Sequence, residues 1–205
     1  MKRNRLPIWT ACHVVLLFAI AHGLGRSSPT FVAYGGTLII YWISCWITLH
    51  IFRPIEPTQP KRHIIFDYLP FLPLIGVALT AISTLDQPPP FPATLTIIVA
   101  ATLNGITEEL YWRRMFCNAF YPNVRLGFAF PLLLFSIWHI ALLLIPGITY
   151  QGGPLALVGG AAVLGLIWAS SYWFNRKIWT ITSAHVLVNM VAFLMLANDN
   201  AWLHG

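Results

Sequence analysis

Charged side chains are scarce in this 205-residue chain: they make up 9% of it, against roughly 25% in an ordinary soluble domain. Only six residues are acidic, whereas apolar residues reach 58%. So little charge cannot cover a water-exposed surface, which excludes a soluble α/β enzyme, and so much apolar sequence excludes a disordered chain. At about 20 residues per spanning helix, the length suits about seven spans joined by short loops.

Nearly continuous apolar runs predict an all-α, polytopic transmembrane helical bundle. The predicted spans are 8–25, 31–52, 65–85, 92–112, 127–146, 154–173 and 178–197. The sequence divides into an N-terminal three-helix membrane segment at 1–91, candidate catalytic helices at 92–197 and a C-terminal tail at 198–205. The basic, then apolar start also resembles a signal peptide, but because similar runs continue along the chain we expect an uncleaved first helix.

The net charge of +6 indicates the orientation of the chain rather than nucleic-acid binding. With the N-terminus in the cytoplasm, eleven of the twelve basic residues fall on the cytoplasmic side and only Arg26 falls outside. This asymmetry is the positive-inside pattern of membrane proteins. We therefore expect a multi-pass protein of the cell membrane, surrounded by the lipid bilayer, with no nucleic-acid partner.

Three further patterns predict packing rather than chemistry. Three prolines inside predicted spans are expected to kink their helices, which neighbouring helices tolerate by satisfying the freed carbonyl groups: Pro70, Pro73 and Pro131. Three small residues on one stripe of the sixth span predict a close-packing face: Ala161, Gly165 and Ala169. The three cysteines lie in separate apolar stretches and are predicted to be reduced, structural thiols.

Ionisable residues inside apolar spans are functional candidates, because placing them in a membrane is costly. The candidates, with one asparagine, come from three helices: Glu108, Glu109 and Arg113 in or directly after the fourth span, His139 in the fifth, and His185 and Asn189 in the seventh. The other five histidines lack a polar partner at helical spacing and are expected at membrane interfaces or in loops: His13, His22, His50, His63 and His204.

Helical geometry predicts different roles for the two glutamates. Consecutive helical residues point about 100° apart, so the two carboxylates cannot share one proton as an aspartic dyad does. Glu109 and Arg113 stand at i and i+4, which predicts an ion pair that holds Glu109 ionised. Glu108 has no cation at that spacing, so it is the predicted general base.

A helical hairpin is predicted to bring His139 to the depth of Glu108, since they lie 16 residues after and 15 residues before Asn123 in the turn. His185 lies about 12 Å inside its own span, nearer the predicted cytoplasmic face. A glutamate, two histidines and an asparagine in one layer suit hydrolysis, in which a carboxylate takes a proton from water and donors stabilise an oxyanion. The alternative is a polar cluster that holds helices together or lines a transport path.

These residues resemble the motifs of the CPBP intramembrane endopeptidases, a family of CaaX proteases and bacteriocin-processing enzymes also called the Abi family. The motifs EExxxR, FxxxH and HxxxN read here as Glu108 to Arg113, Phe135 to His139 and His185 to Asn189, in that order. The resemblance covers roughly residues 92–197 and extends to the type II CaaX prenyl endopeptidases. The first three predicted spans match only as generic spans.

The resemblance implies a glutamate-dependent endopeptidase that cleaves a protein or peptide at the membrane, with lipidated CaaX proteins among the family's substrates. It implies Glu108 and His139 for activating water, His185 and Asn189 for stabilising the oxyanion, and Glu109, Arg113 and Phe135 for supporting the site. The sequence has no HExxH, which favours a site without a metal cofactor; zinc held by Glu108, His139 and His185 is the alternative. A non-catalytic scaffold or carrier that retains the fold also stays open.

Overall fold

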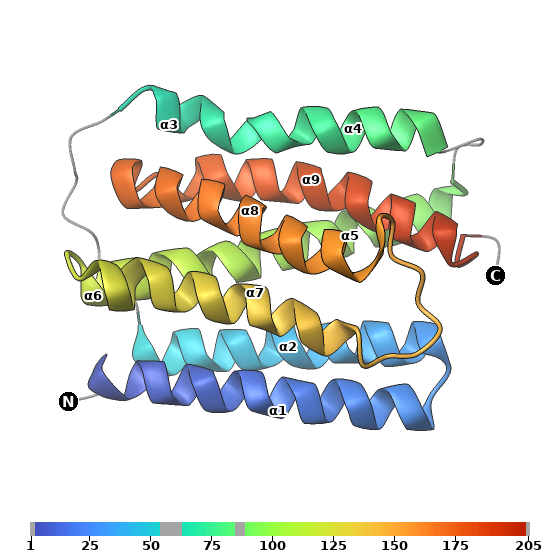
Figure 1. The fold of residues 1–205 in the computed structure, drawn as a ribbon, viewed down its shortest axis with the longest axis horizontal. Coiled ribbons are helices and arrows are strands. Elements are labelled where there is room, and N and C mark those ends of the chain that lie inside the picture. The colour runs from blue at the N-terminus through green and yellow to red at the C-terminus, as the bar shows by residue number, and fades with distance from the viewer. Residues whose placement is uncertain (1–2, 54–62, 85–88, 204–205) are drawn as a thin grey trace.

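The computed structural model describes residues 3–53, 63–84 and 89–203. These residues form helices and turns, with no strand among them. The helices lie side by side along the long axis of the molecule (Figure 1). Within the described ranges, seven helical stretches are long and apolar enough to cross a membrane. The predicted all-α bundle of seven spans is confirmed, while its cytoplasmic N-terminus and the division at residue 91 stay predictions.

The seven stretches contain nine α-helices, because two of the stretches, Ile65–Thr84 and Phe91–Phe120, are each interrupted by a different helical segment. The α-helices in chain order are α1 Leu6–Ser27, α2 Thr30–Phe52, α3 Ile65–Tyr68, α4 Leu72–Thr84, α5 Phe91–Glu108, α6 Phe116–Phe120, α7 Phe130–Leu142, α8 Gly153–Asn175 and α9 Ile178–Asp199. Between them lie a 3₁₀ turn at Leu69–Phe71 and π-helical segments at Glu109–Met115 and Arg125–Ala129; another 3₁₀ turn, Arg3–Arg5, precedes α1.

Two of the predicted span boundaries differ from the structure by more than two residues. The fourth stretch runs past residue 112 to Phe120, because Arg113 is buried inside the bundle rather than placed at a membrane edge. The fifth ends at Leu142 rather than at residue 146. Pro146 has no N–H to donate to the carbonyl of Leu142, and the Tyr150 hydroxyl donates to that carbonyl instead, at 3.0 Å.

The three prolines inside spans lie at or next to breaks in regular α-helix. Pro70 lies in the 3₁₀ turn between α3 and α4, and Pro73 lies in the first turn of α4. Pro131 lies in the first turn of α7, directly after a π-helical segment. The indole of Trp168 in α8 donates to the carbonyl oxygen of Pro70 at 3.2 Å. A neighbouring helix therefore satisfies a carbonyl group at one of these breaks.

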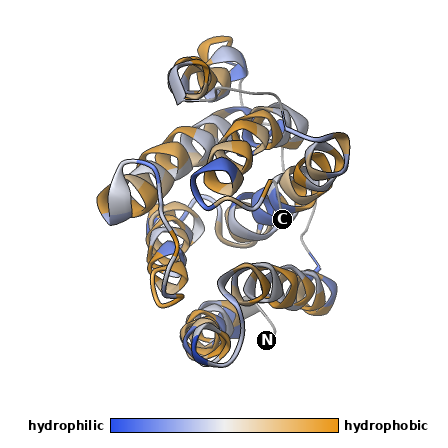
Figure 2. Cartoon of the chain, turned by 90° about the vertical axis from the view of Figure 1, so that its right-hand side faces the viewer, coloured by the Kyte–Doolittle hydropathy of each residue, from blue (hydrophilic) through white to orange (hydrophobic). Residues whose placement is uncertain are grey.

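The helices form an interior and two edges. Viewed end-on, the α1–α2 pair lies at one edge of the bundle and α4 lies at the opposite edge, with the remaining helices between them (Figure 2). The most extensive contact between helices joins α5 to α9. Large apolar side chains such as Ile82 and Leu155 are exposed on the outside, as expected of a surface that faces lipid. The polar groups of the candidate site are therefore enclosed between α2, α5, α7, α8 and α9.

Some predictions concern residues beyond the described ranges. Lys2, Lys61 and Arg62, which contribute to the basic asymmetry, and His204 lie outside the described residues. The three cysteines are free thiols, as predicted: Cys12 is exposed, and Cys45 and Cys117 are buried.

Candidate active site

The two glutamates stand at the junction where α5 becomes the π-helical segment Glu109–Met115. Glu108 is the last residue of α5, and Glu109 is the first residue of the π-helical segment. Their exposed fractions are 2% and 0%. π-Helical insertions in α-helices are frequent at functional sites, because they turn side chains away from the regular helical register. Here both carboxylates reach α9.

One imidazole lies between the two carboxylates. His185 Nδ1 lies 2.7 Å from Glu109 Oε1, and His185 Nε2 lies 3.3 Å from Glu108 Oε2. A neutral imidazole has only one N–H, so both contacts are hydrogen bonds only when the three groups hold one extra proton. With Arg113 included, that cluster has no net charge, which lowers the cost of burying it. The sequence predicted that the carboxylates do not meet each other, but it did not predict the histidine between them.

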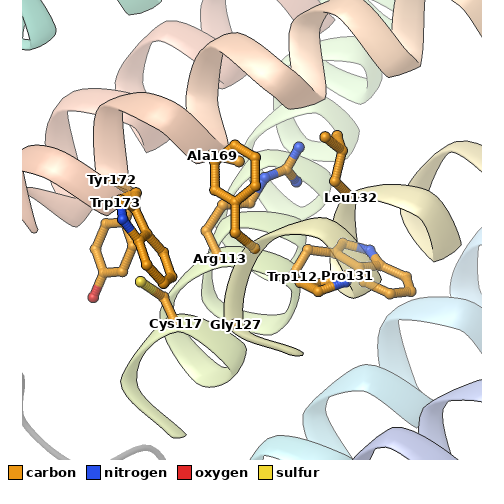
Figure 3. Close-up of a pocket in the computed structure, with 10 residues that line it drawn as sticks. Trp112, Arg113, Cys117, Gly127, Pro131, Leu132, Ala169, Tyr172 and Trp173 are labelled. Atoms are coloured by element: carbon orange, nitrogen blue, oxygen red, sulfur yellow. The ribbon is translucent and has the colours of Figure 1, made fainter. Parts of the chain in front are cut away.

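Arg113 forms the predicted ion pair with Glu109. Its Nη1 lies 3.4 Å from Glu109 Oε1, and the two side chains are 3% and 0% exposed. The guanidinium also lies over the ring of Phe135, with Cζ 4.1 Å from the ring centroid, a favourable cation–π arrangement. Figure 3 shows Arg113 among the side chains around a hollow of about 10 Å³, which is too small for a ligand. Arg113 is thus enclosed by side chains of α7 and α8.

Two glycines allow the helices that carry the site to approach closely. A Cβ on Gly105 would lie 2.7 Å from Val186 Cγ2 and 3.1 Å from the Val186 amide nitrogen. Glycine at 105 thus lets α5 and α9 meet one residue away from His185. A Cβ on Gly165 would lie 2.9 Å from Phe135 Cδ1, so the predicted small-residue face of α8 packs against α7.

Glu108, His139, His185 and Asn189 line a single chamber of about 300 Å³. His139 Nδ1 lies 2.8 Å from the carbonyl oxygen of Phe135, to which it donates, so its Nε2 is an acceptor in the neutral ring. Asn189 is 8% exposed, and its Nδ2 is buried without a hydrogen-bond partner among the described residues. The structure therefore brings all four predicted catalytic residues to one chamber, and the amide group of Asn189 is available to donate a hydrogen bond there.

The sequence did not predict the contribution of α2 to this site. The Tyr41 hydroxyl donates to Glu108 Oε1 at 3.0 Å and accepts a hydrogen bond from Trp112 Nε1 at 2.6 Å. Tyr41 is fully buried, and its ring stacks on Trp138 at a centroid distance of 4.2 Å. A buried tyrosine needs a polar partner for its hydroxyl, so Tyr41 in a predicted span was a usable signal.

The predicted location of His13 is wrong. His13 is 7% exposed, with Nδ1 3.0 Å from the Tyr111 hydroxyl and Nε2 2.6 Å from Ser44 Oγ. Its partners come from α2 and the π-helical segment, which helical spacing within α1 could not reveal. His22, His50 and His63 are exposed, and their places at membrane interfaces or in loops stay predictions.

The residues proposed as zinc ligands do not fit a metal site in this arrangement. Among the described residues, no three His, Cys, Asp or Glu side chains are grouped so that they could hold a metal ion. Both nitrogens of His185 already face carboxylates, at 2.7 and 3.3 Å. No step is derived through a metal.

Comparison with protein families gives a match over about half of the chain. The model described as "Rce1-like: Type II CAAX prenyl endopeptidase Rce1-like" matches residues 90–191, a stretch that contains the three motifs from Glu108 to Asn189. Comparison with the curated proteins and with the solved structures gives no significant match. The chain is therefore a multi-pass membrane protein that belongs, through residues 90–191, to the Rce1-like type II CAAX prenyl endopeptidase family, a family of membrane proteases.

Proposed function

We propose that this protein is an intramembrane endopeptidase that uses Glu108 to hydrolyse a peptide bond of a membrane-associated protein or peptide. The observation that carries this proposal is that Glu108, His139, His185 and Asn189 converge on one chamber. Its substrates include lipidated chains, as the description of the family suggests.

The proposed reaction begins with transfer of a proton from water to Glu108. The water oxygen attacks the carbonyl carbon of the substrate, and the Nε2 atom of His139 accepts a hydrogen bond from that water. The Nδ2 group of Asn189 donates to the oxyanion of the tetrahedral intermediate. Glu108 then gives its proton to the leaving amine as the C–N bond breaks, which restores the carboxylate.

His185 has an orienting role in this proposal. The resemblance assigns His185 to the oxyanion together with Asn189, but both of its nitrogens face glutamates. We therefore assign the oxyanion donor to Asn189, while His185 holds Glu108 in place. Tyr41 holds the other oxygen of Glu108, so the carboxylate is fixed from two sides.

The proposed position of the reaction is near the cytoplasmic face of the cell membrane. His185 is the eighth residue of α9, so it lies about 10 Å from the end of that helix at which the N-terminus also lies (Figure 1). The basic residues predict that this end is cytoplasmic. A reporter fused after Trp202 that is found in the cytoplasm would contradict this orientation.

The two glutamates provide the test of the mechanism. Glu108→Gln keeps an acceptor for Tyr41 but removes the base, so it should abolish turnover while thermal stability changes little. Glu109→Gln weakens a buried ion pair, so it should lower activity together with stability. Comparative peptidomics of membranes carrying each variant measures turnover, and thermal unfolding of the purified proteins measures stability.

The outcomes separate the alternatives. Activity that persists in Glu108→Gln but is lost in a well-folded Glu109→Gln would reverse the two assignments. Wild-type membranes whose peptides match those of Glu108→Gln membranes would favour a scaffold or carrier instead.

We further propose that the reaction needs no metal cofactor. The amide Nδ2 of Asn189 is a donor, which suits an oxyanion but cannot ligate a cation. Purified protein should contain no stoichiometric zinc, and its activity should survive ortho-phenanthroline. One zinc per chain by elemental analysis, with activity lost on chelation and restored by zinc, would replace this mechanism with a metal-dependent one.

A further inference from the structure

A second carboxamide, that of Asn104 in α5, lines the same chamber as Glu108. Asn104 is 6% exposed and lies one helical turn before Glu108. The proposed reaction gives this side chain no role. Burying an amide between membrane-spanning helices is costly unless its polar atoms are bonded or used, so each of them needs a partner or a function.

The orientation of the Asn104 amide is set by one hydrogen bond. The indole Nε1 of Trp42 in α2 donates to Asn104 Oδ1 at 2.8 Å. Because an indole nitrogen is a donor only, the amide oxygen has to face Trp42, which leaves the NH₂ group for the chamber. The Nδ2 atom of Asn104 makes no hydrogen bond with any of the residues that the structure describes. The chamber therefore receives a donor whose rotation is already restrained.

Asn104 and Asn189 lie at the same depth in the bundle. Glu108 and His185 mark one level, because Oε2 of the glutamate lies 3.3 Å from Nε2 of the histidine. From this level α5 leads back, and α9 leads on, towards the same end of the bundle (Figure 1). Asn104 is four residues before Glu108 and Asn189 is four residues after His185, so each lies about 6 Å further along. The two carboxamides therefore share one layer of the chamber, one from each helix.

The oxyanion of the proposed reaction has room for more than one donor. Both nitrogens of His185 face glutamates, so Asn189 Nδ2 is the donor assigned to the oxyanion so far. Oxyanion holes stabilise the developing charge with preorganised donors, because these need no reorganisation when the tetrahedral intermediate forms. The restrained NH₂ group of Asn104 has this property.

We propose that Asn104 Nδ2 is a second donor to the oxyanion, alongside Asn189, and that Trp42 is a positioning residue that holds the Asn104 amide. The inference rests on the proposed peptidase function, because it adds a donor to that reaction. The competing role for Asn104 is structural: it would only link α5 to α2. That role depends on Oδ1 alone, so the two roles can be separated.

Asn104→Asp separates the two roles, because aspartate keeps an oxygen for Trp42 and loses the NH₂ group. Removal of one oxyanion donor should lower kcat roughly 100- to 1,000-fold with KM nearly unchanged. Asn104→Leu, which adds no charge beside Glu108, should lower kcat to a similar extent. Turnover is measured on the full chain in lipid nanodiscs, with a peptide that wild-type membranes cleave and Glu108→Gln membranes do not. Thermal unfolding of each variant monitors its stability.

Two tryptophans of α2 supply matched variants for the positioning role. Trp42→Phe removes the donor that holds the Asn104 amide, whereas Trp46→Phe removes a donor to Thr107, which does not line the chamber. Trp42→Phe should lower kcat about tenfold with KM nearly unchanged, because the amide is then free to rotate, and Trp46→Phe should leave kcat unchanged. A merely structural role of Trp42 would lower thermal stability in both variants without separating their kcat values.

A small aldehyde tests the donors without turnover. The hydrate of N-acetyl-leucinal has two oxygens on a tetrahedral carbon, one for Glu108 and one for the amide donors, whereas N-acetyl-leucinol has one oxygen on that carbon. None of the described residues that line the chamber is Lys or Cys, so the wall offers the aldehyde no amine or thiol. By ligand-observed NMR in nanodiscs, wild type should bind the aldehyde at least tenfold more tightly than the alcohol, and Asn104→Leu should lose this preference.

Each result decides the proposal. Wild-type kcat in both Asn104 variants overturns it, as does a higher KM with unchanged kcat, which would indicate a contact with the bound substrate before reaction. A preference for the aldehyde that wild type lacks, or that Asn104→Leu retains, also overturns it. A preference that depends on Asn104, in a wild type that cleaves no peptide, would retain the pair of donors and refute the proposed peptidase function alone.

Discussion

The helices α2 and α5, which build the interior of the site, differ from the peripheral helix formed by α3 and α4. In α2, Tyr41 and Trp46 donate hydrogen bonds to Glu108 and Thr107 of α5. In α4 the hydroxyls of Thr80, Ser83 and Thr84 donate to carbonyls of their own helix. In α2, 44% of the 18-residue apolar stretch that could span a membrane is buried, against 11% of the corresponding stretch in Ile65–Thr84.

Hydropathy does not reveal this difference. The apolar stretches of α2 and of Ile65–Thr84 have similar mean hydropathies, 1.5 and 1.8. Both helices precede residues 90–191, the region that matches the family. The distinguishing feature is the kind of polar group: the indole and phenol groups of α2 reach another helix, whereas short hydroxyls can bond within their own turn. In the N-terminal half, α2 therefore donates a hydrogen bond to the proposed base, whereas α4 contributes an apolar side chain, Val77, to the chamber wall.

The largest difference in stability between the two regions is expected when the basic residue of an ion pair is replaced in each of them. Arg113→Leu leaves Glu109 buried without its cation and should cost about 3–5 kcal/mol of unfolding free energy. Lys177→Met removes the pair with Asp67 of α3, in which the lysine is 40% exposed, and should cost about 1 kcal/mol or less. Unfolding in mixed micelles measures both values.

Equal costs for these two substitutions would break the comparison. They would mean that the Glu109 cluster is hydrated or that α3 is as tightly held as α5. Activity is a second readout, since only Arg113→Leu should lower it.

Much of the fold was predictable from the sequence because a membrane restricts the alternatives. Seven apolar runs predict seven spanning helices, since a lipid environment requires every backbone group to be bonded within its own helix. The pair of Glu109 and Arg113 was predictable for a similar reason, because it depends only on helical spacing.

Contacts between helices were not predictable in the same way. The bonds of Tyr41 to Glu108 and of His13 to Tyr111 join residues 67 and 98 positions apart, so they depend on how the helices pack. The π-helical register that starts at Glu109 also has no simple signature in the sequence. The residue types of the site were therefore readable, whereas the partners of His185 required the structure.

A smaller difference in stability is expected when a glycine is replaced by alanine in each of the two regions. Gly105→Ala places a methyl group 3.1 Å from the backbone of Val186, which must move α9 and His185 away from the glutamates. This substitution should cost about 1–3 kcal/mol and reduce turnover. Gly76→Ala in α4 meets nothing within 4 Å and should stabilise the helix by up to about 1 kcal/mol. Thermal unfolding that shifts equally for both variants would contradict the close approach of α5 and α9.

The smallest substitution, which removes a single hydroxyl, should lower activity when it is made in α2 and leave activity unchanged when it is made in α3. Tyr41→Phe retains the ring that stacks on Trp138 but removes the donor to Glu108. Hydrogen bonds to charged groups contribute about 1.5–3 kcal/mol, so kcat should fall roughly 10- to 100-fold if the bond aligns the base in the transition state. The matched variant Tyr68→Phe in α3 removes a hydroxyl from a side chain that is 71% exposed and should change nothing.

The division of the effect between kcat and KM identifies the role of Tyr41. A positioning role predicts a lower kcat with KM nearly unchanged, because Tyr41 contacts the base and does not line the chamber. A purely structural role predicts a loss of thermal stability that accounts for the loss of activity. If Tyr41→Phe has wild-type kcat and stability, then Glu108 is held by His185 alone, and α2 belongs with α4 as a helix that packs around the site.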